Sequence, residues 1–414
     1  MNCASHPANF IKMPRFCIIE SAARCRTYIS RRAGIQGETF VDIHIEEVKT
    51  KKQLKQFIVF PDTLYRNNPY WVPSLYFDEI NTLDPKKNPA FEFCKARYFL
   101  AFRGKEIVGR IAGIINDRYI ELWKNKYARF GWVDFIEDFS VAEALFNTVE
   151  TWAKERGMTG IQGPLGFTDF DKEGMLVEGF NETGTLPTIY NYPYYPGYLE
   201  RIGYVKETDW VEYRIKIPGE VQPDILRIAN IAERRLKLKV VHLKRSKDLL
   251  PYAKKIFKLL NDGYKNLFGF VPLTDIQIQA YIRQYFSFVN PDFIQVVVDS
   301  NNELAAIGIT MPSLSKALQK SKGKLFPFGF IRLLRAIKHN DLVDLYLITV
   351  RQDLQGKGVN AILMREAQTA CIKYGVKTVY ACPELETNMN VRGQWKYYEN
   401  EQHKRRRCYT KLLK

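Results

Sequence analysis

The stretch Leu345-Tyr-Leu-Ile-Thr-Val350, continued by Arg351-Gln-Asp-Leu-Gln-Gly-Lys-Gly-Val-Asn360, decides the fold of this 414-residue chain. Its first six residues are mostly apolar or β-branched and predict a buried strand. The polar turn that follows contains Gly356 and Gly358, and apolar residues at helical spacing then predict a helix over Val359–Tyr374. Backbone N–H groups at a helix start are unpaired and carry the positive end of the helix dipole, and glycines let a ligand approach them. The stretch therefore predicts a cradle for a pyrophosphate.

This turn has neither the GxGxxG spacing of a Rossmann fold nor the GK[ST] of a P-loop. The stretch resembles the acetyl-CoA-binding signature of the GCN5-related N-acetyltransferase (GNAT) superfamily, in which a strand is followed by V-x-P-E-Y-Q-G-K-G-x-G and a helix. Val350 matches the strand-end valine, Asp353 the acidic position, and Gln355-Gly-Lys-Gly358 the core. The positions that depart from the signature are Gln352, Leu354 and Asn360.

The resemblance implies acetyl-CoA or a longer acyl-CoA as co-substrate, with no metal. Backbone groups around Ile348, Thr349 and Val350 are expected to pair with the pantetheine arm. The N–H groups expected to hold the pyrophosphate are those of Gln355, Gly356, Lys357, Gly358, Val359, Asn360 and Ala361.

The superfamily's later segment N-x-x-A-x-x-x-Y carries a tyrosine that protonates the departing thiolate. By resemblance, Asn388 takes the Asn position and Trp395 falls on the tyrosine. Because an indole cannot serve as this acid, either the reaction proceeds without it or Tyr397 or Tyr398 takes the role. A tyrosine, with an ordinary pKa near 10, stays protonated until it is needed.

Candidate bases for the acceptor amine are Glu384 and Glu386, just past a predicted strand at Val376–Ala381. Either carboxylate could accept the proton directly or through a water molecule. The alternative is that both are solvated surface acids.

The chain contains the same order of predicted elements twice, so we infer an internal duplication, with chance similarity of two α/β segments as the alternative. Each copy has a hairpin, a third strand, a helix ended by glycine and a fourth strand. The paired segments are the hairpins 98–115 and 293–310, the helices 141–156 (capped at Ser140) and 359–374, and the strands 159–162 and 376–381.

The predicted fold is accordingly α/β (α+β), with two tandem GNAT-like domains that each have a mixed, mostly antiparallel sheet flanked by helices. Residues 1–38 are expected to be a disordered or misassigned extension, 39–218 a degenerate domain and 219–414 the domain that binds acyl-CoA. The first copy runs from 131–137 directly to Ser140 with no glycine-rich turn, so it cannot form the same cradle. We expect it to shape an acceptor pocket, lined by the glycine-containing loop 163–174, for which a surface turn is the alternative.

The second copy is longer by an insertion at Met311–His339, which carries seven Lys and Arg, no acid and ten large apolar residues. This composition suits an amphipathic segment on an anionic membrane or an amphiphilic substrate. An ordinary packing insertion with solvated lysines is the alternative.

The net charge of +17 is compatible with nucleic acid, a membrane surface or a phosphorylated co-substrate. Seven cysteines without a CxxC pair and five scattered histidines predict neither a disulfide framework nor a zinc site. No apolar run is long enough for a transmembrane helix. We expect a cytoplasmic protein, or one peripheral at the inner membrane surface through 311–339.

The predicted function is acyl-CoA-dependent N-acyl transfer by direct attack of an amine. The layout, with Asn68-Pro-Tyr-Trp-Val-Pro73 near its front, resembles a bacterial tandem-GNAT family of poorly known function that includes lipid N-acyltransferases of the ceramide-synthase kind. The acceptor is then a small amine or a lipid or sphingoid-type amine. The alternatives are an inactive GNAT-like binding module and a nucleic-acid-binding protein that uses the basic tail 404–414.

Overall fold

The first repeat folds in the predicted order of hairpin, third strand, helix and fourth strand. The computed structural model describes residues 42–286 and 289–414, and the predicted extension at 1–38 lies outside this range. The elements of the first repeat are β1 (Ile43–Glu47), α1 (Lys51–Leu64), α2 (Tyr76–Leu83), β2 (Cys94–Arg103), β3 (Glu106–Asn116), α3 (Asp117–Trp123), β4 (Tyr127–Phe135), α4 (Phe139–Lys154), β5 (Gly160–Gly163), β6 (Met175–Glu178), α5 (Tyr194–Ile202) and β7 (Val205–Lys216).

The second repeat has the same order and carries two additional helices at the predicted insertion. Its elements are α6 (Pro223–Leu236), β8 (Lys239–Val241), α7 (Ala253–Tyr264), α8 (Asp275–Tyr285), β9 (Ile294–Val298), β10 (Leu304–Pro312), α9 (Ser315–Ser321), α10 (Gly329–Lys338), β11 (Leu342–Val350), α11 (Val359–Lys373), β12 (Thr378–Ala381), β13 (Glu384–Leu385), α12 (Met389–Arg392) and β14 (Asn400–Leu412). The predicted duplication is thus present in the fold.

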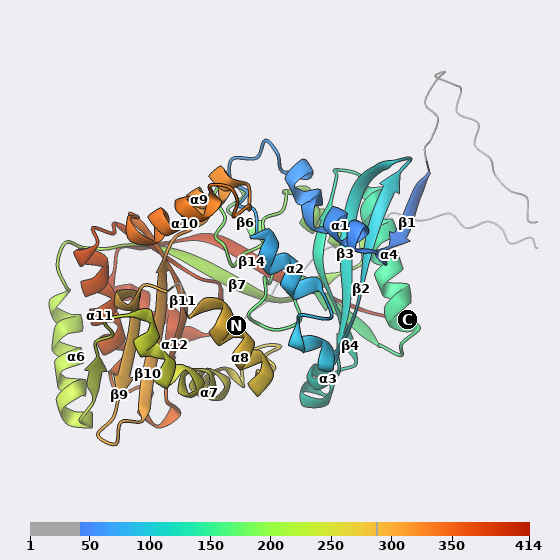
Figure 1. Cartoon of the computed structure of the whole chain (residues 1–414). Helices are drawn as coiled ribbons and strands as arrows, with labels where there is room; N and C mark the ends of the chain where they lie inside the picture. The colour runs from blue at the N-terminus through green and yellow to red at the C-terminus, as the bar shows by residue number, and fades with distance from the viewer. Residues whose placement is uncertain (1–41, 287–288) are drawn as a thin grey trace, which may run out of the picture. The chain divides into compact units, whose positions relative to one another are not determined.

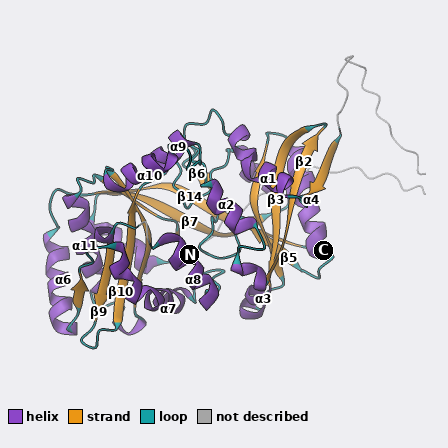
Figure 2. Cartoon of the chain, in the orientation of Figure 1, coloured by secondary structure: helices purple, strands orange, loops and turns teal. Residues whose placement is uncertain are grey.

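The strands of residues 42–286 and 289–414 join one mixed sheet of fourteen strands (Figures 1 and 2). Their order is β1-β2-β3-β4-β5-β14-β7-β12-β11-β10-β9-β8, with β6 paired to β14 and β13 paired to β7. In the second repeat, α6 and α11 pack against one face of the sheet, and α7 and α8 pack against the other. The helices thereby bury the strand that leads into the glycine-rich turn from both sides.

The two repeats exchange their last strands. β14, from the second repeat, lies between β5 and β7 and pairs antiparallel with both. β7, from the first repeat, pairs antiparallel with β12 of the second repeat. Each repeat therefore completes its sheet with a strand of the other. The boundary between the domains 39–218 and 219–414 stays a prediction, and these strand pairings cross it.

The basic tail is used inside the fold. Lys404 and Arg406 are buried in β14 and pair with the carboxylate of Glu212 on β7. Arg407 pairs with the carboxylate of Asp209 on the opposite side of the strand, at 2.8 Å. These charges thus join the exchanged strands, which weakens the sequence argument for binding nucleic acid.

The helix α4 begins earlier than predicted. Its N-cap is Asp138 and not Ser140, and the Oδ1 atom of Asp138 accepts a hydrogen bond from the backbone N–H of Ser140 at 2.8 Å. A carboxylate at this position also interacts favourably with the helix dipole. Within the described ranges, none of the helices is both long and apolar enough to cross a bilayer.

Candidate active site

A wedge opens between β11 and β12, beside the glycine-rich turn. The two strands pair in parallel from Leu342 and Thr378 to Leu345 and Ala381. The last contact is the N–H of Cys382 donating to the carbonyl of Leu345 at 3.1 Å. β11 then continues to Val350, whereas the segment that follows β12 turns away and pairs with β7 as β13. One edge of β11 beyond Leu345 therefore has no neighbouring strand.

The register of β11 turns the predicted pantetheine contacts toward this wedge. A bulge leaves Tyr346 without a partner on β10, since Leu345 pairs with Thr310 and Leu347 with Ile309. Beyond it, Arg351 N–H donates to the carbonyl of Ala305 on β10 at 2.9 Å. Because hydrogen-bonding residues alternate in an antiparallel pair, Ile348 and Val350 direct their backbone groups away from β10.

The carbonyls of these two residues already have side-chain partners. Tyr264, at the end of α7, donates its hydroxyl to the carbonyl of Ile348 at 3.2 Å, and Gln355 Nε2 donates to the carbonyl of Val350 at 3.0 Å. The backbone N–H groups of Ile348 and Val350 stay directed into the wedge. Thr349 lies between them with its backbone turned toward β10, so its predicted contact with the co-substrate would have to come from its side chain.

The turn leads into a helix whose N-terminus is open. Gly356 and Gly358 have φ angles of +71° and +84°, in the left-handed region that favours glycine. Gly358 is the N-cap of α11, and no side chain caps this end of the helix. A Cβ atom at Gly358 would lie 3.1 Å from a methyl carbon of Ile228 on α6. The N–H groups of the first turn, at Val359 and Asn360, are thereby available to an anion.

Two residues of the turn have structural roles: Leu354, which departs from the signature, and Asp353, which matches it. Leu354 is buried in the core beneath α11, where it anchors the turn as an aromatic residue would. Asp353 pairs with the guanidinium of Arg351 at 2.7 Å, and Arg351 also reaches Asp299 at 2.8 Å. These contacts hold the start of the turn against the loop that contains Asp299.

The corresponding place in the first repeat is closed. α4 is capped by the carboxylate of Asp138, as described above. Tyr195 places its hydroxyl 2.7 Å from the N–H and 3.0 Å from the carbonyl of Phe135, at the end of β4. The Tyr195 hydroxyl thus forms hydrogen bonds with the backbone groups that would otherwise face a pantetheine. This supports the view that the first repeat binds no CoA.

Glu384 is held beside the wedge by the residue that replaces the usual tyrosine. Trp395 Nε1 donates to both carboxylate oxygens of Glu384, at 3.0 and 3.1 Å, and both side chains are buried. Burial raises the pKa of Glu384 to about 7, and the hydrogen bond from Trp395 opposes this rise. Burial also raises the pKa of Tyr264, and the nearby groups Cys382 and Glu384 add to that rise. Glu384 therefore titrates near neutrality next to the edge of β11.

The other predicted catalytic residues lie in less suitable places. Tyr398 is buried, and its hydroxyl points to Gln368 of α11 at 3.4 Å. Tyr397 packs at the edge of the same core, and Asn388 is the N-cap of α12 without a capping side-chain bond. Glu386 is paired with Lys206 at 2.7 Å. Among the described catalytic candidates, Glu384 has the surroundings of a base.

Sequence reasoning missed two polar residues on β11. Asp344 is fully buried, and neither of its carboxylate oxygens has a hydrogen-bond partner in the part of the chain that the structure describes. Burial raises its pKa to about 7. The hydroxyl of Tyr346, at the bulge, likewise has no partner there. An acid in an otherwise apolar strand was the signal that could have indicated this position.

No protein-family model matches the chain. It is 26% identical over 372 residues to Protein YghO of Escherichia coli (strain K12), covering 88% of this chain and 94% of that protein. It is 29% identical over 307 residues to a bacterial ceramide synthase of Caulobacter vibrioides, covering 72% of this chain and 78% of that protein. Among solved structures, a tandem GNAT protein from the clavulanic acid biosynthesis pathway matches with a TM-score of 0.52 at 12% identity, covering 90% of this chain and 99% of that one. The chain thus has the tandem GNAT fold.

Proposed function

We propose that this tandem-GNAT chain is an N-acyltransferase that moves an acyl group from acyl-CoA to an amine. The observation that carries the proposal is the open N-terminus of α11 beside the unpaired edge of β11, with the buried carboxyl of Glu384 next to it. The relative named as a ceramide synthase supports N-acyl transfer, and it favours a long-chain, sphingoid-type amine as the acceptor.

In this mechanism the amine nitrogen attacks the thioester carbonyl carbon, so that a C–N bond forms and the C–S bond breaks. Glu384, directly or through a water molecule, takes the proton that the amine loses. Trp395 positions that carboxylate. The thiolate takes up a proton from one of the predicted candidates Tyr397 and Tyr398, or from Tyr264, whose hydroxyl already lies against Ile348. The alternative is that it leaves without a protein acid and is protonated by water. The turn and the first turn of α11 bind the pyrophosphate through backbone N–H groups.

The proposal predicts that acyl-CoA stabilises the chain and that an amide product forms. A ligand at 100 times its Kd adds about 2.7 kcal/mol to the free energy of unfolding, which corresponds to a rise in Tm of roughly 3 °C or more. Thermal unfolding with acetyl-CoA and palmitoyl-CoA, and mass spectrometry of reactions with short and long-chain amines, would measure both. If neither CoA ester shifts Tm and no amide appears, the proposal fails. If Tm rises and no amine is acylated, the chain is the inactive binding module instead.

We further propose that the insertion 311–339 contacts an anionic membrane. Part of it packs on the first repeat, since Leu318 and Leu333 share a core with Val72, as the packing alternative predicts. The rest presents apolar side chains to solvent, with Phe326 77% and Phe328 64% exposed. Exposed basic residues lie on the same helices and the turn between them: Lys316, Lys320, Lys322, Lys324, Arg332, Arg335 and Lys338. Aromatic side chains beside basic residues suit the interface of anionic lipids. The cytoplasmic location stays a prediction.

Replacing Phe326 and Phe328 together with Ser is expected to lower binding to vesicles of phosphatidylcholine and phosphatidylglycerol about tenfold. Co-sedimentation would measure binding. A soluble short-chain amine should be acylated at the parental rate, because the two substituted residues lie outside the wedge. Vesicles of phosphatidylcholine alone serve as the control for charge. Parental binding by the double variant would contradict this contact.

A further inference from the structure

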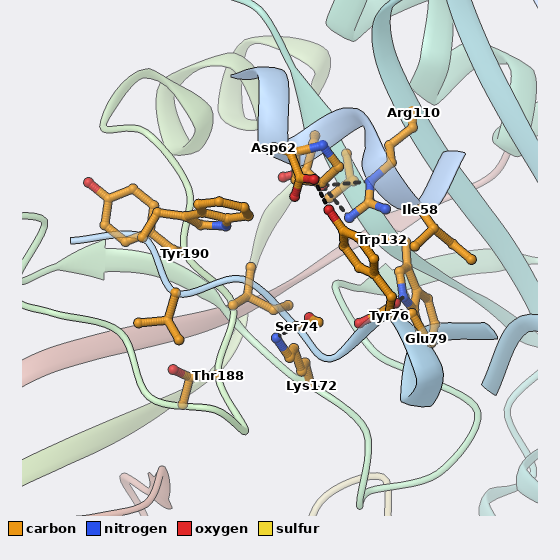
Figure 3. A pocket seen from close by; sticks show the side chains of 16 residues that line it. Ile58, Asp62, Ser74, Tyr76, Glu79, Arg110, Trp132, Lys172, Thr188 and Tyr190 are labelled. Atoms are coloured by element: carbon orange, nitrogen blue, oxygen red, sulfur yellow. Dashed lines mark hydrogen bonds and ion pairs between the residues drawn. The ribbon is translucent and has the colours of Figure 1, made fainter. Parts of the chain in front are cut away.

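A cavity in the first repeat lies where α1 and the segment 71–76 face the end of β4 and the segment 188–190 (Figure 3). Among the charged groups that line it are Asp62 of α1, Glu79 of α2 and Lys172 from the loop after β5. Aromatic side chains, including Trp71 and Trp132, form much of the rest. The proposed reaction assigns no role to these residues.

The fixed charges of the cavity leave one negative charge uncompensated. Arg110 and Asp134 also line it, but they satisfy each other at 2.7 Å, and Tyr65 donates to the second oxygen of Asp134 at 2.8 Å. The remaining groups are the carboxylates of Asp62 and Glu79 against the single ammonium of Lys172. Burial raises the pKa of Asp62 to about 6, and Lys324, Arg110 and Lys322 oppose this rise. Lys322 and Lys324 lie in the turn between α9 and α10 and are exposed, so solvent screens them.

The two carboxylates and the ammonium have hydrogen-bonding capacity left over. Asp62 accepts from the hydroxyl of Tyr76, and Glu79 accepts from Trp132 Nε1 at 2.7 Å. Each carboxylate can accept further bonds. Lys172 Nζ donates to Ser74 Oγ at 2.7 Å, and an ammonium has three N–H groups to donate. Burial lowers the pKa of Lys172, as expected for an amine short of partners.

One wall of the cavity holds a strained residue. Trp132, on β4, has a φ of +44°, which is an outlier for a bulky side chain. Such a conformation costs about 1–3 kcal/mol and tends to persist where a site requires it. It lies at an irregularity in the pairing of β3 with β4, between the partners Gly131 and Asp134, and this position directs the indole to Glu79.

We propose that this cavity binds a protonated amino alcohol. The ammonium of the ligand would pair with Asp62 and Glu79 and lie against the aromatic faces, which attract cations. A hydroxyl of the ligand would accept from Lys172. The segment 71–76 also carries the insertion, since Gln319 Nε2 donates to the carbonyl of Trp71 at 3.0 Å and Tyr76 N–H donates to the carbonyl of Gly323 at 3.2 Å. The cavity therefore adjoins the same segment as the insertion, whose exposed apolar residues include Phe326 and Phe328, as an amphiphilic ligand requires.

Calorimetric titration of the full chain with 2-amino-1,3-octadecanediol tests the site without acyl-CoA. The N-acetyl derivative, which keeps the chain and hydroxyls but has no charge, should bind at least tenfold more weakly. Asp62→Asn should weaken binding of the amine at least tenfold, Lys172→Met should weaken it several-fold, and Asp62→Glu should restore most of the affinity. Glu386→Gln, which changes a carboxylate already paired with Lys206 at 2.7 Å, should leave this affinity unchanged.

Parental affinity in both Asp62→Asn and Lys172→Met would overturn the site, as would loss of binding in Glu386→Gln alone or the absence of any binding. A variant whose Tm equals that of the parent is not misfolded. Restored affinity in Asp62→Glu would show that the charge of Asp62, and not its packing, holds the ligand. The choice of ligand class follows the proposed acceptor, but the outcomes are distinguishable. Amine binding without acyl transfer counts against the proposed function, and acyl transfer with parental affinity in the cavity variants counts against this site.

Discussion

Glu384→Gln is expected to lower kcat by about 100-fold or more, since a positioned general base contributes roughly 10²–10⁴ to rate. Glutamine preserves the shape of the side chain and the oxygen that accepts from Trp395, but it cannot take up a proton. In the parent, kcat/KM should rise with pH through the pKa of Glu384, near 7, because only the carboxylate is a base. Steady-state kinetics from pH 5.5 to 9 would measure both effects.

The same substitution should raise stability at alkaline pH. The folded-state pKa of Glu384, about 7, lies above its ordinary value of 4.5 because the side chain is buried. Between these two values the unfolded chain loses this proton and the folded chain keeps it, so the free energy of unfolding falls as pH rises. At about 1.4 kcal/mol per pKa unit, the loss is up to about 3 kcal/mol and is complete above pH 7. Glu384→Gln removes it.

Glu386→Gln is the matched control, because that carboxylate is paired with Lys206 and Arg405 and should not affect kcat by more than about twofold. Trp395→Phe tests whether Trp395 positions the carboxylate of Glu384. Losing the indole bonds, which lower the pKa of Glu384, should move the pH profile to higher pH. If Glu384→Gln keeps the parental kcat, the base lies elsewhere on the wedge.

The parts of this molecule that the sequence predicts well are local. The strand into Val350, the glycine turn and the helix from Val359 depend on periodicity and on conformations that only a few residues adopt, and the structure confirms them. Trp395, by contrast, looks like the loss of a catalytic tyrosine. Its role depends on a contact with Glu384, eleven positions away along the chain, that no spacing rule describes.

The parts that the sequence does not predict are long-range pairings. The insertion of β14 between β5 and β7 joins segments roughly 185 to 250 residues apart along the chain. Nothing in the pattern of β14 distinguishes these partners from those within its own repeat. The partners of Asp62 and Lys172 likewise come from separate elements, so the cavity had no signature in the sequence.

Asn360→Asp is expected to weaken acyl-CoA binding by 100-fold or more while stabilising the free protein. The substitution changes one N–H₂ group to an oxygen and adds a charge at the second position of α11. With no ligand, a carboxylate at a helix N-terminus contributes about 0.3–1 kcal/mol of stability. With a pyrophosphate on the same N–H groups, two like charges about 5 Å apart at an effective dielectric of 20 cost roughly 3 kcal/mol. The two effects have opposite signs, so lost affinity cannot be ascribed to unfolding.

Two measurements complete this test. The Kd for CoA by calorimetry should increase in Asn360→Asp and change little in Asn360→Ala, which removes the side chain without adding charge. Because the repulsion is electrostatic, raising the salt concentration should recover part of the affinity of the Asp variant relative to the parent. An unchanged Kd in Asn360→Asp would mean that the anion is not held at the N-terminus of α11. The observation that carries the proposed function would then have to be replaced, whatever activity the chain shows.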